Sequence, residues 1–579
     1  MKHLALPAAL AGLLLAACGG DAPPAPAATT ADTPPAESLL LPLPDATVPE
    51  IRAADLAIRI KTLADDAFEG RGPGTPAGEA SADWIAAEMA RIGLKPGGPG
   101  GSWFQPVKMV NQTIDESASS LIVTWPDGED LSLGLSQDTV IWTKHQHTDH
   151  IAFDPAEVIF VGYGAVAPEY GWDDYLGAEM DYTGKTVIML VNDPGFATRD
   201  PELFNGRAMT YYGRWTYKFE EAARQGATAA LVIHETEPAS YGWDVVAGSW
   251  SGAQSDLVRP DGGASRAMLE GWITRDMAVQ MFQRAGLDFD AVKQSASQRS
   301  FRPVPLTGVS VRGEIHQTIE QLESRNVIGV VEGTVTPDEY ILYMAHWDHL
   351  GMKTGAPGED FYEDQIFNGA VDNATGTAAI LEIAEAVVAD PMQRSVMFVA
   401  VTLEESGLLG SAYFAENPTV PLNRIVAGMN IDGVLPIGRT RDMIVIGYGA
   451  SELEDILKSV LAESGRVVSP DARPEAGFFY RSDHISLAKV GVPMLYADGG
   501  EDALEGGVAA GRAAAAVYTI ERYHKPMDEY SDSWDLSGME EDMGVLLEVG
   551  RRIGNSSDWP TWYPGNEFEA IRQESLAGN

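Results

Sequence analysis

A histidine and an aspartate stand two residues apart near the middle of the chain, where they could form part of a metal site. His346 and Asp348 follow directly after the strand-like run 340–345. Residues two apart on an extended segment project to the same side, so His346 can bind a metal ion while Asp348 holds the orientation of its imidazole. A lone His-x-Asp pair is a weak signal, because structural ion pairs produce the same pattern frequently.

A second acidic group precedes a predicted helix. Asp372 lies in the segment 368–376, just before the helical pattern 378–388. Aligned peptide dipoles favour a negative charge at this position, and the ordinary use of such an aspartate is as a helix N-cap. A carboxylate fixed there can also bridge two cations with its two oxygens, so both interpretations stay open at this point.

Two neighbouring glutamates, Glu404 and Glu405, follow the apolar run 396–402, which is typical of a buried strand. Carboxylates beside a buried strand are costly unless cations or hydrogen bonds compensate them. At a strand end the two side chains can point in different directions, so that one ligates a cation while the other faces the attacking water. The alternative is a solvated acidic loop, which is common in a chain with 84 acidic side chains against 40 basic ones.

The remaining groups are Asp432, which follows another apolar stretch, and His524 near the end of the same region. Each segment is a weak signal, but the order His, Asp, Glu-Glu, Asp and His resembles metallopeptidase family twenty-eight. This family comprises exported di-zinc aminopeptidases, and its members also include glutamate carboxypeptidase II and the transferrin receptor. The resemblance covers about residues 50–555.

The resemblance implies a pair of zinc ions, two Zn²⁺ per chain, bridged by the carboxylate of Asp372. One ion would also be bound by His346 and Asp432, and the other by Glu405 and His524. Zinc ions lower the pKa of bound water and withdraw charge from a carbonyl oxygen, which is the chemistry that peptide hydrolysis needs.

The resemblance also implies roles for side chains around the metals. Glu404 would be the general base, Asp348 would orient His346, and Tyr523 would polarise the scissile carbonyl. His349 matches no family role and is interpreted as a structural histidine. The residues that match a stretch lining the substrate pocket are Arg481, Asp483 and His484.

Strand and helix patterns alternate from about residue 305 to 555, with the first strand-like run at 326–331, which predicts an α/β fold with a mixed, largely parallel sheet flanked by helices. Functional groups are then expected at strand ends. The family resemblance implies the di-zinc exopeptidase fold. Short apolar strands and glycines in 152–305 resemble the protease-associated domain, a β-rich α/β insertion that frames substrate access in many exported peptidases. A generic small α/β insertion is the alternative.

The N-terminus is predicted to be a bacterial lipoprotein signal. A short basic start precedes an apolar stretch that ends in Leu15-Ala16-Ala17-Cys18, which resembles a lipobox. Cys18 would be lipidated and hold an exported protein at a membrane surface, facing the periplasm or the cell exterior. An ordinary cleaved secretory signal is the alternative. Because Cys18 is the only cysteine, an intrachain disulfide is excluded.

The predicted organisation is therefore a lipoprotein signal peptide with lipobox (1–18), a flexible Ala/Pro-rich tether (19–49), the N-terminal part of a peptidase domain (50–151), a protease-associated insertion (152–305), the catalytic part of the peptidase domain (306–555) and a C-terminal tail (556–579).

The net charge and the hydropathy of the chain exclude other classes of protein. The net charge is 40 − 84 = −44, which would repel phosphate backbones, so nucleic acid is not expected as a partner. No apolar run reaches the roughly 20 residues that span a bilayer, which excludes a polytopic membrane protein. Peptides are the expected substrates.

Aminopeptidase activity is expected first, because it is the commonest activity of exported family members with such an insertion. A carboxypeptidase or dipeptidase is the nearest alternative and would need basic residues, such as Arg481, to hold a substrate carboxylate. Glutaminyl cyclases share the scaffold but use one zinc. A non-catalytic binding lipoprotein, comparable with the transferrin receptor, is disfavoured because all five ligands and the base are present.

Overall fold

The computed structural model describes residues 41–176, 179–250, 252–353 and 364–577 of the 579-residue chain. The predicted lipoprotein signal with Cys18 lies outside the described residues, as do residues 19–40 of the predicted tether. Residues 41–49 of that tether contact the folded part: Leu41 and Leu43 pack against the main core, and the Thr47 hydroxyl donates to Glu385 over 2.7 Å. Among the described helices, none combines the length and apolar character needed to cross a bilayer.

The sheet in the predicted catalytic part (306–555) confirms the predicted α/β fold. Four strands run parallel, with β14 between β17 and β18 and with β21 beside β18. Their bounds are β14 (Thr336–His346), β17 (Arg394–Val401), β18 (Ile425–Asn430) and β21 (Met494–Gly499). All eight residues of β17 are buried, as expected of a parallel strand that is covered on both faces.

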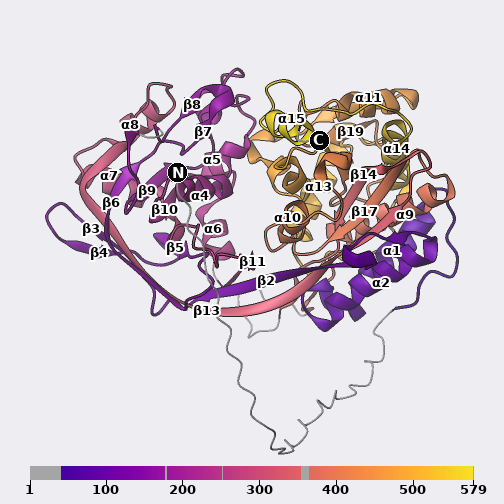
Figure 1. The fold of residues 1–579 in the computed structure, drawn as a ribbon, viewed down its shortest axis with the longest axis horizontal. Helices are drawn as coiled ribbons and strands as arrows, with labels where there is room; N and C mark the ends of the chain where they lie inside the picture. Colours follow the sequence, from indigo (N-terminus) through magenta and orange to yellow (C-terminus); the bar gives the residue numbers. More distant parts are fainter. Residues whose placement is uncertain (1–40, 177–178, 251, 354–363, 578–579) are drawn as a thin grey trace, which may run out of the picture. The chain divides into compact units, whose positions relative to one another are not determined.

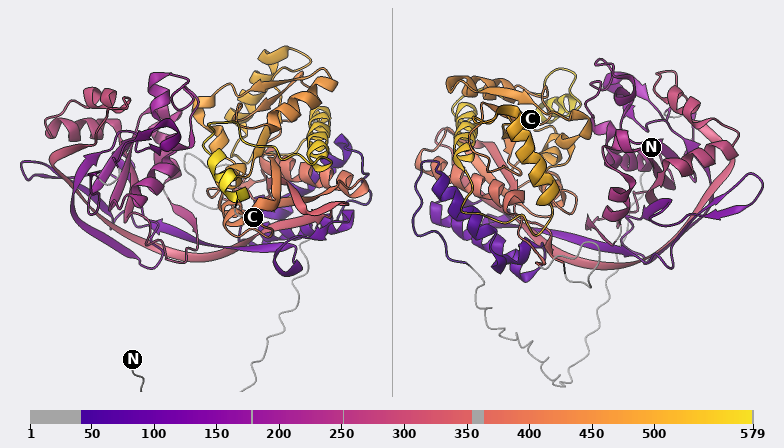
Figure 2. Two further views of the ribbon diagram at one scale, coloured as in Figure 1. Left: turned by 45° about the horizontal axis from the view of Figure 1, so that its top comes forward. Right: turned by 180° about the vertical axis from the view of Figure 1, so that it is seen from behind.

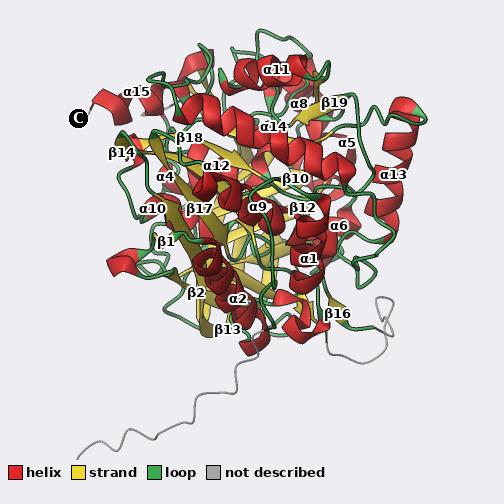
Figure 3. Cartoon of the chain, turned by 90° about the vertical axis from the view of Figure 1, so that its right-hand side faces the viewer, coloured by secondary structure: helices red, strands yellow, loops and turns green. Residues whose placement is uncertain are grey.

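Helices cover both faces of this sheet. The helices α1, α2, α9 and α14 pack on one face, and Figure 3 shows them in front of the strands. The shorter helices α10 and α12 pack on the other face. Their bounds are α1 (Ala53–Leu63), α2 (Pro76–Ile92), α9 (Gly376–Ala389), α10 (Leu409–Glu416), α12 (His484–Ala488) and α14 (Ser537–Gly554).

The parallel arrangement brings three predicted site segments to one edge of the sheet. His346 is the last residue of β14, Glu404 follows the end of β17, and Asp432 follows the end of β18. The strand register places His346 opposite Val401. Side chains that are separated by up to 86 residues in sequence are therefore neighbours because of strand order.

The insertion contains a second parallel sheet with its own apolar cores. Its strands lie in the order β6, β9, β10, β12, with β5 antiparallel at the end. Their bounds are β5 (Thr139–Trp142), β6 (His150–Phe160), β9 (Thr186–Leu190), β10 (Ala229–His234) and β12 (Leu269–Thr274). β5 precedes the predicted insertion boundary at residue 152 but pairs within this sheet.

One long strand joins the two sheets. The sequence pattern predicted a short strand at 326–331, whereas the structure has the 28-residue β13 (Val304–Val331). Its first half pairs with β6, its middle with β2 (Phe104–Ile114), and its last residues with β17. Figure 1 shows β13 and β2 running side by side, and Figure 2 shows the same pair from two further directions.

The expected helix 378–388 falls within α9, and the expected strands 340–345 and 396–402 coincide with β14 and with most of β17. The helix α2 ends at Ile92, directly before Gly93. Gly93 has a φ of 104°, a left-handed conformation that favours glycine. In the first half of β13, buried residues alternate with partly or fully exposed ones. The sequence there has no continuous apolar run that would predict a strand.

Candidate metal centre

The first group of candidate ligands gathers around His346. Its Nε2 lies 3.2 Å from Asp372 Oδ1 and 3.2 Å from Asp432 Oδ1. The Nδ1 of His346 lies 3.1 Å from the backbone carbonyl of Asp348, which can only accept, so Nδ1 donates. In the neutral imidazole with Nδ1 protonated, Nε2 carries the lone pair, which is the tautomer that a metal ligand requires.

The second group uses the other oxygen of the same aspartate. His524 Nε2 lies 3.3 Å from Asp372 Oδ2 and 3.2 Å from Glu405 Oε2. Each carboxylate oxygen of Asp372 thus faces a different imidazole. Burial raises the pKa of Asp372, but the hydrogen bonds with His346 and His524 outweigh it and hold this pKa well below its usual value.

The spacing of these donor atoms fits metal ions. Around a tetrahedral zinc ion with bonds of 2.0–2.1 Å, neighbouring ligand atoms are about 3.3 Å apart. The four nitrogen–oxygen separations across the two groups are 3.2, 3.2, 3.3 and 3.2 Å. The five side chains predicted as ligands therefore converge, with donor types suited to zinc.

His349 contacts the second group, although the sequence assigned it no role. Its Nδ1 donates to Glu405 Oε1 over 2.6 Å, and its side chain is fully buried. This bond occupies one oxygen of Glu405 and leaves Oε2 facing His524. His349 thus holds a candidate ligand in place, and one ring nitrogen of His349 also lies within 4.8 Å of donor atoms of Asp372 and Glu405.

Asp528 holds the loop that carries Asp372 in place through hydrogen bonds to its backbone. The backbone N–H groups of Val371 and Asp372 donate to the Asp528 carboxylate over 3.1 Å each, and the peptide bond from Asp372 to Asn373 is cis. The N-cap of α9 is Thr375. Asp372 is therefore not the N-cap of that helix, so its carboxylate is available to the site.

A buried arginine ties this loop to the end of β14. Arg71 donates to the backbone carbonyls of Trp347 over 2.7 Å, Leu63 over 2.8 Å and Gly369 over 2.8 Å, and also to that of Asn368. Burial lowers its pKa to about 10, although nearby carboxylates raise it. Arg71 thus fixes two site-bearing loops in one geometry.

Glu404 stands beside the first group. Its backbone N–H donates to Asp348 Oδ1 over 3.2 Å, and the same oxygen lies 3.9 Å from His346 Nδ1. Asp348 therefore connects the histidine and the glutamate, with its backbone carbonyl rather than its carboxylate closest to the imidazole. Burial raises the pKa of Glu404; His346 lowers it and Glu405 raises it, so the pKa lies well above its usual value.

Tyr523 lies at the open side of the centre. Its ring stacks on His524 with the centroids 3.9 Å apart, and 44% of the residue is exposed. The phenol is therefore held next to a candidate ligand while a substrate can still reach it.

The segment that carries most of these residues is similar to a known family. Residues 326–544 match the model of peptidase family M28. This segment is a peptidase family M28 domain. The match confirms the family that the order of the motifs resembled.

Related proteins include aminopeptidases. Aminopeptidase NAALADL1 of Mus musculus is 33% identical over 133 residues, which are 22% of this chain and 16% of that protein. Aminopeptidase YwaD of Bacillus subtilis (strain 168) is 29% identical over 113 residues, 19% of this chain and 22% of that protein. This chain thus spans less than a quarter of either relative.

Among solved structures, the aminopeptidase from Aneurinibacillus sp. strain AM-1 aligns with 88% of this chain and 96% of its own chain. The sequence identity is 17% and the TM-score is 0.48.

The predicted pocket residues of the M28 domain lie in two different environments. Asp483 and His484 are fully buried, and His484 packs between the rings of Phe479 and Tyr496. Burial raises the pKa of Asp483 to about 7 and lowers that of His484 to about 3. Arg481 instead faces the insertion, where its guanidinium lies 5.7 Å from the centre of the Tyr241 ring.

Ser482, in the same segment, contacts the metal centre directly. Its hydroxyl donates to Asp432 Oδ2 over 2.5 Å and accepts from Asn430 Nδ2 over 2.7 Å. Sequence reasoning did not assign roles to Ser482, Asp528 or Arg71. Asp528 stands four residues after His524, and Ser482 lies between the predicted pocket residues Arg481 and Asp483, so proximity in sequence was a signal for both. Arg71 lies 276 residues before Trp347 and had no such signal.

Replacing Arg71 with methionine should destabilise the M28 domain and weaken its metal centre. The substitution leaves buried carbonyls without donors, so we expect a loss of about 3 kcal/mol in the free energy of unfolding. Urea denaturation and the zinc content of the purified protein are the measurements. The matched control is Arg312→Met, which removes an ion pair with Asp130 at the surface and should leave the stability nearly unchanged. Equal stabilities of the two variants would contradict the role of Arg71.

The buried imidazole of His484 should make stability depend on pH. Its pKa is about 3 in the folded chain and about 6.5 in an unfolded one. Between these values the unfolded chain binds the extra proton, so stability falls as the pH falls, by about 1.4 kcal/mol per pH unit. From pH 7.5 to 5, the wild type should lose about 2 kcal/mol more than His484→Gln in urea unfolding. Parallel pH profiles would show that His484 does not titrate in this way.

Proposed function

We propose that the protein is a zinc-dependent exopeptidase that removes N-terminal residues from peptides. The observation that carries this proposal is the placement of Asp372 between two imidazoles, each with a further carboxylate beside it. The M28 match and the names of the aminopeptidase relatives support the same activity.

Two zinc ions would be held by the two groups, sharing Asp372. His346 and Asp432 would complete one site, and Glu405 and His524 the other. Zinc bound there supplies Lewis-acid chemistry, because it acidifies water and stabilises negative charge on a carbonyl oxygen. The carboxylates and imidazoles of this chain are the hard and borderline donors that suit such an ion.

Glu404 is the general base in this proposal. Its carboxylate takes a proton from the attacking water and returns it to the leaving amine. Burial and the charges of neighbouring carboxylates raise the pKa of Glu404, while His346 lowers it. The hydrogen bond from its backbone to Asp348 fixes the start of the Glu404 side chain relative to His346.

Tyr523 would donate its O–H to the oxygen of the scissile carbonyl as negative charge develops there. A donor that is already oriented needs little reorganisation in the transition state. Stacking on His524 orients the phenol in this way, and its exposure leaves it accessible to a bound peptide.

A second candidate activity, cleavage of peptides held by a free carboxylate, is favoured by a pair of arginines. Burial lowers the pKa of Arg481 and that of Arg214 in the insertion, and the charge of Arg481 lowers the pKa of Arg214 further. Among the described residues, the Nε of Arg214 and the Nε and Nη2 of Arg481 have no hydrogen-bond partner. Guanidinium groups without partners suit a substrate carboxylate.

Export and lipidation at Cys18, with a membrane-anchored protein that faces the periplasm or cell exterior, remain proposals from the sequence. The same holds for the protease-associated character of the insertion.

Substrate assays should separate the two activities. We expect hydrolysis of aminoacyl-nitroanilides, and no hydrolysis of N-acetylated peptides with a free carboxylate, because the acidic centre would hold a free amino terminus. Dialysis against a chelator should abolish the activity and added Zn²⁺ should restore it. Cleavage of the acetylated peptides alone would replace the aminopeptidase proposal by the carboxypeptidase one, and activity insensitive to chelation would exclude both.

Glu404→Gln tests the general base. The amide keeps the size of the side chain but cannot accept the proton, so kcat should fall by about 10²–10⁴ while zinc content stays unchanged. Glu463→Gln is the matched control, since Glu463 is exposed on α11 (Leu453–Glu463) and should retain full activity. A normal kcat for Glu404→Gln would refute its role.

A further inference from the structure

A second cluster of metal-ligating side chains lies where β6 pairs with β13, outside the M28 centre. His150 at the start of β6 stands directly opposite His316 on β13. Glu314 precedes His316 by two residues on β13, so both side chains project from the same face of the strand. Strand pairing alone therefore places two imidazoles and one carboxylate together.

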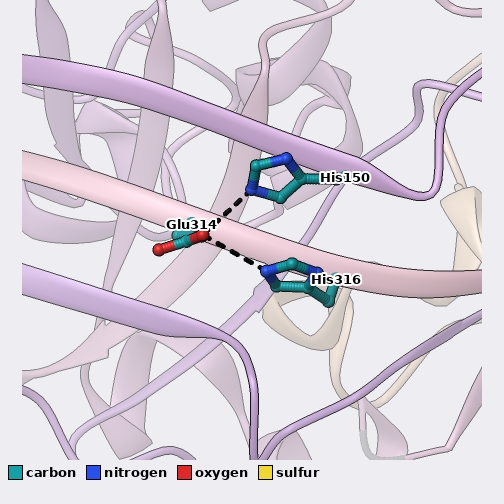
Figure 4. Close-up of side chains that lie close together, drawn as sticks. All are labelled: His150, Glu314 and His316. Atoms are coloured by element: carbon teal, nitrogen blue, oxygen red, sulfur yellow. Dashed lines mark hydrogen bonds and ion pairs between the residues drawn. The ribbon is translucent and has the colours of Figure 1, made fainter.

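The three side chains converge on one point. His150 Nε2 lies 2.9 Å and His316 Nε2 lies 3.2 Å from the same oxygen, Glu314 Oε1. The two imidazole rings are stacked, with their centroids 4.3 Å apart and their planes 23° from parallel. Figure 4 shows both rings directed at Glu314, and one donor atom of each residue lies within 4.8 Å of the other two.

The backbone beneath the cluster is anchored on both strands. His316 donates its N–H to Ser119 Oγ over 2.9 Å, and its carbonyl accepts from the N–H of Asp115 over 2.8 Å. Gln317 donates its N–H to the carbonyl of Asp149 over 2.9 Å and its Nε2 to the carbonyl of Thr148 over 2.8 Å. The three side chains are thus presented from fixed positions.

The donor set selects a class of ion. Two imidazoles and one carboxylate suit zinc, nickel or copper, whereas calcium and magnesium prefer oxygen ligands. Histidine is scarce, with 10 in 579 residues, yet two stand opposite each other here. His150 and Glu314 are roughly half exposed, with side-chain exposures of 46% and 48%, so an ion can enter and solvent can complete its coordination.

We propose that His150, Glu314 and His316 form a binding site for a divalent transition-metal ion, distinct from the M28 centre. The site lies at the last pair of β6 and β13, one residue before β13 begins to pair with β2. A bound ion would therefore cross-link the two strands at the point where β13 passes from the sheet of the insertion toward the catalytic sheet. The proposal shares no residue with the proposed catalytic function.

Zinc stoichiometry of the full chain tests the proposal. After equilibrium dialysis against Zn²⁺, elemental analysis should find one more ion per chain in the wild type than in His150→Ala or His316→Ala. His147→Ala is the matched control, because it removes an exposed histidine of the same segment that is not part of this cluster, and it should keep the wild-type value. His346→Ala should lose zinc at the M28 centre and still keep the additional ion.

Two further results decide the proposal. When the M28 centre is already filled, further Zn²⁺ should raise the melting temperature of the wild type and of His147→Ala. This rise should be absent in His150→Ala and His316→Ala. Cu²⁺ bound in the His346→Ala background should give an electron paramagnetic resonance spectrum with two nitrogen ligands. Equal zinc contents in the wild type, His150→Ala and His316→Ala would overturn the proposal, whatever the M28 centre binds.

Discussion

The carboxylate of Asp372 is the group on which the candidate active site depends. One of its oxygens faces His346 and the other faces His524, so it connects two ligand groups that come from distant parts of the chain. Its position is set by backbone hydrogen bonds to Asp528 and by Arg71, which holds the preceding carbonyls. A shift of this loop would separate both groups at once.

The surrounding charges explain why cations belong here. Carboxylates crowd the edge of the sheet, and burial raises the pKa of Asp348 to about 7 and that of Glu404 well above its usual value. Negative charges without counter-ions are unfavourable in a buried site. Arg71 offsets part of this charge, but its hydrogen bonds go to backbone carbonyls. Divalent cations between the donors would supply the remaining compensation.

The sequence predicted those features that follow from local patterns. Apolar runs located the parallel strands, and a ligand at each strand end follows from the topology of such sheets. Arg71 and the bond between His349 and Glu405 could not be predicted in this way, because each depends on packing between segments far apart in the chain. β13 was also missed over most of its length, since half-exposed residues interrupt its apolar pattern.

The continuous backbone of β13 has a mechanical consequence. An extended strand rises about 3.3 Å per residue and is already near its greatest length, so its 28 residues can bend and twist but cannot stretch. Any movement of the inserted sheet relative to the other sheet must therefore leave the length of β13 unchanged. The hydrogen-bonded registers at both ends of β13 oppose sliding of its partner strands along it.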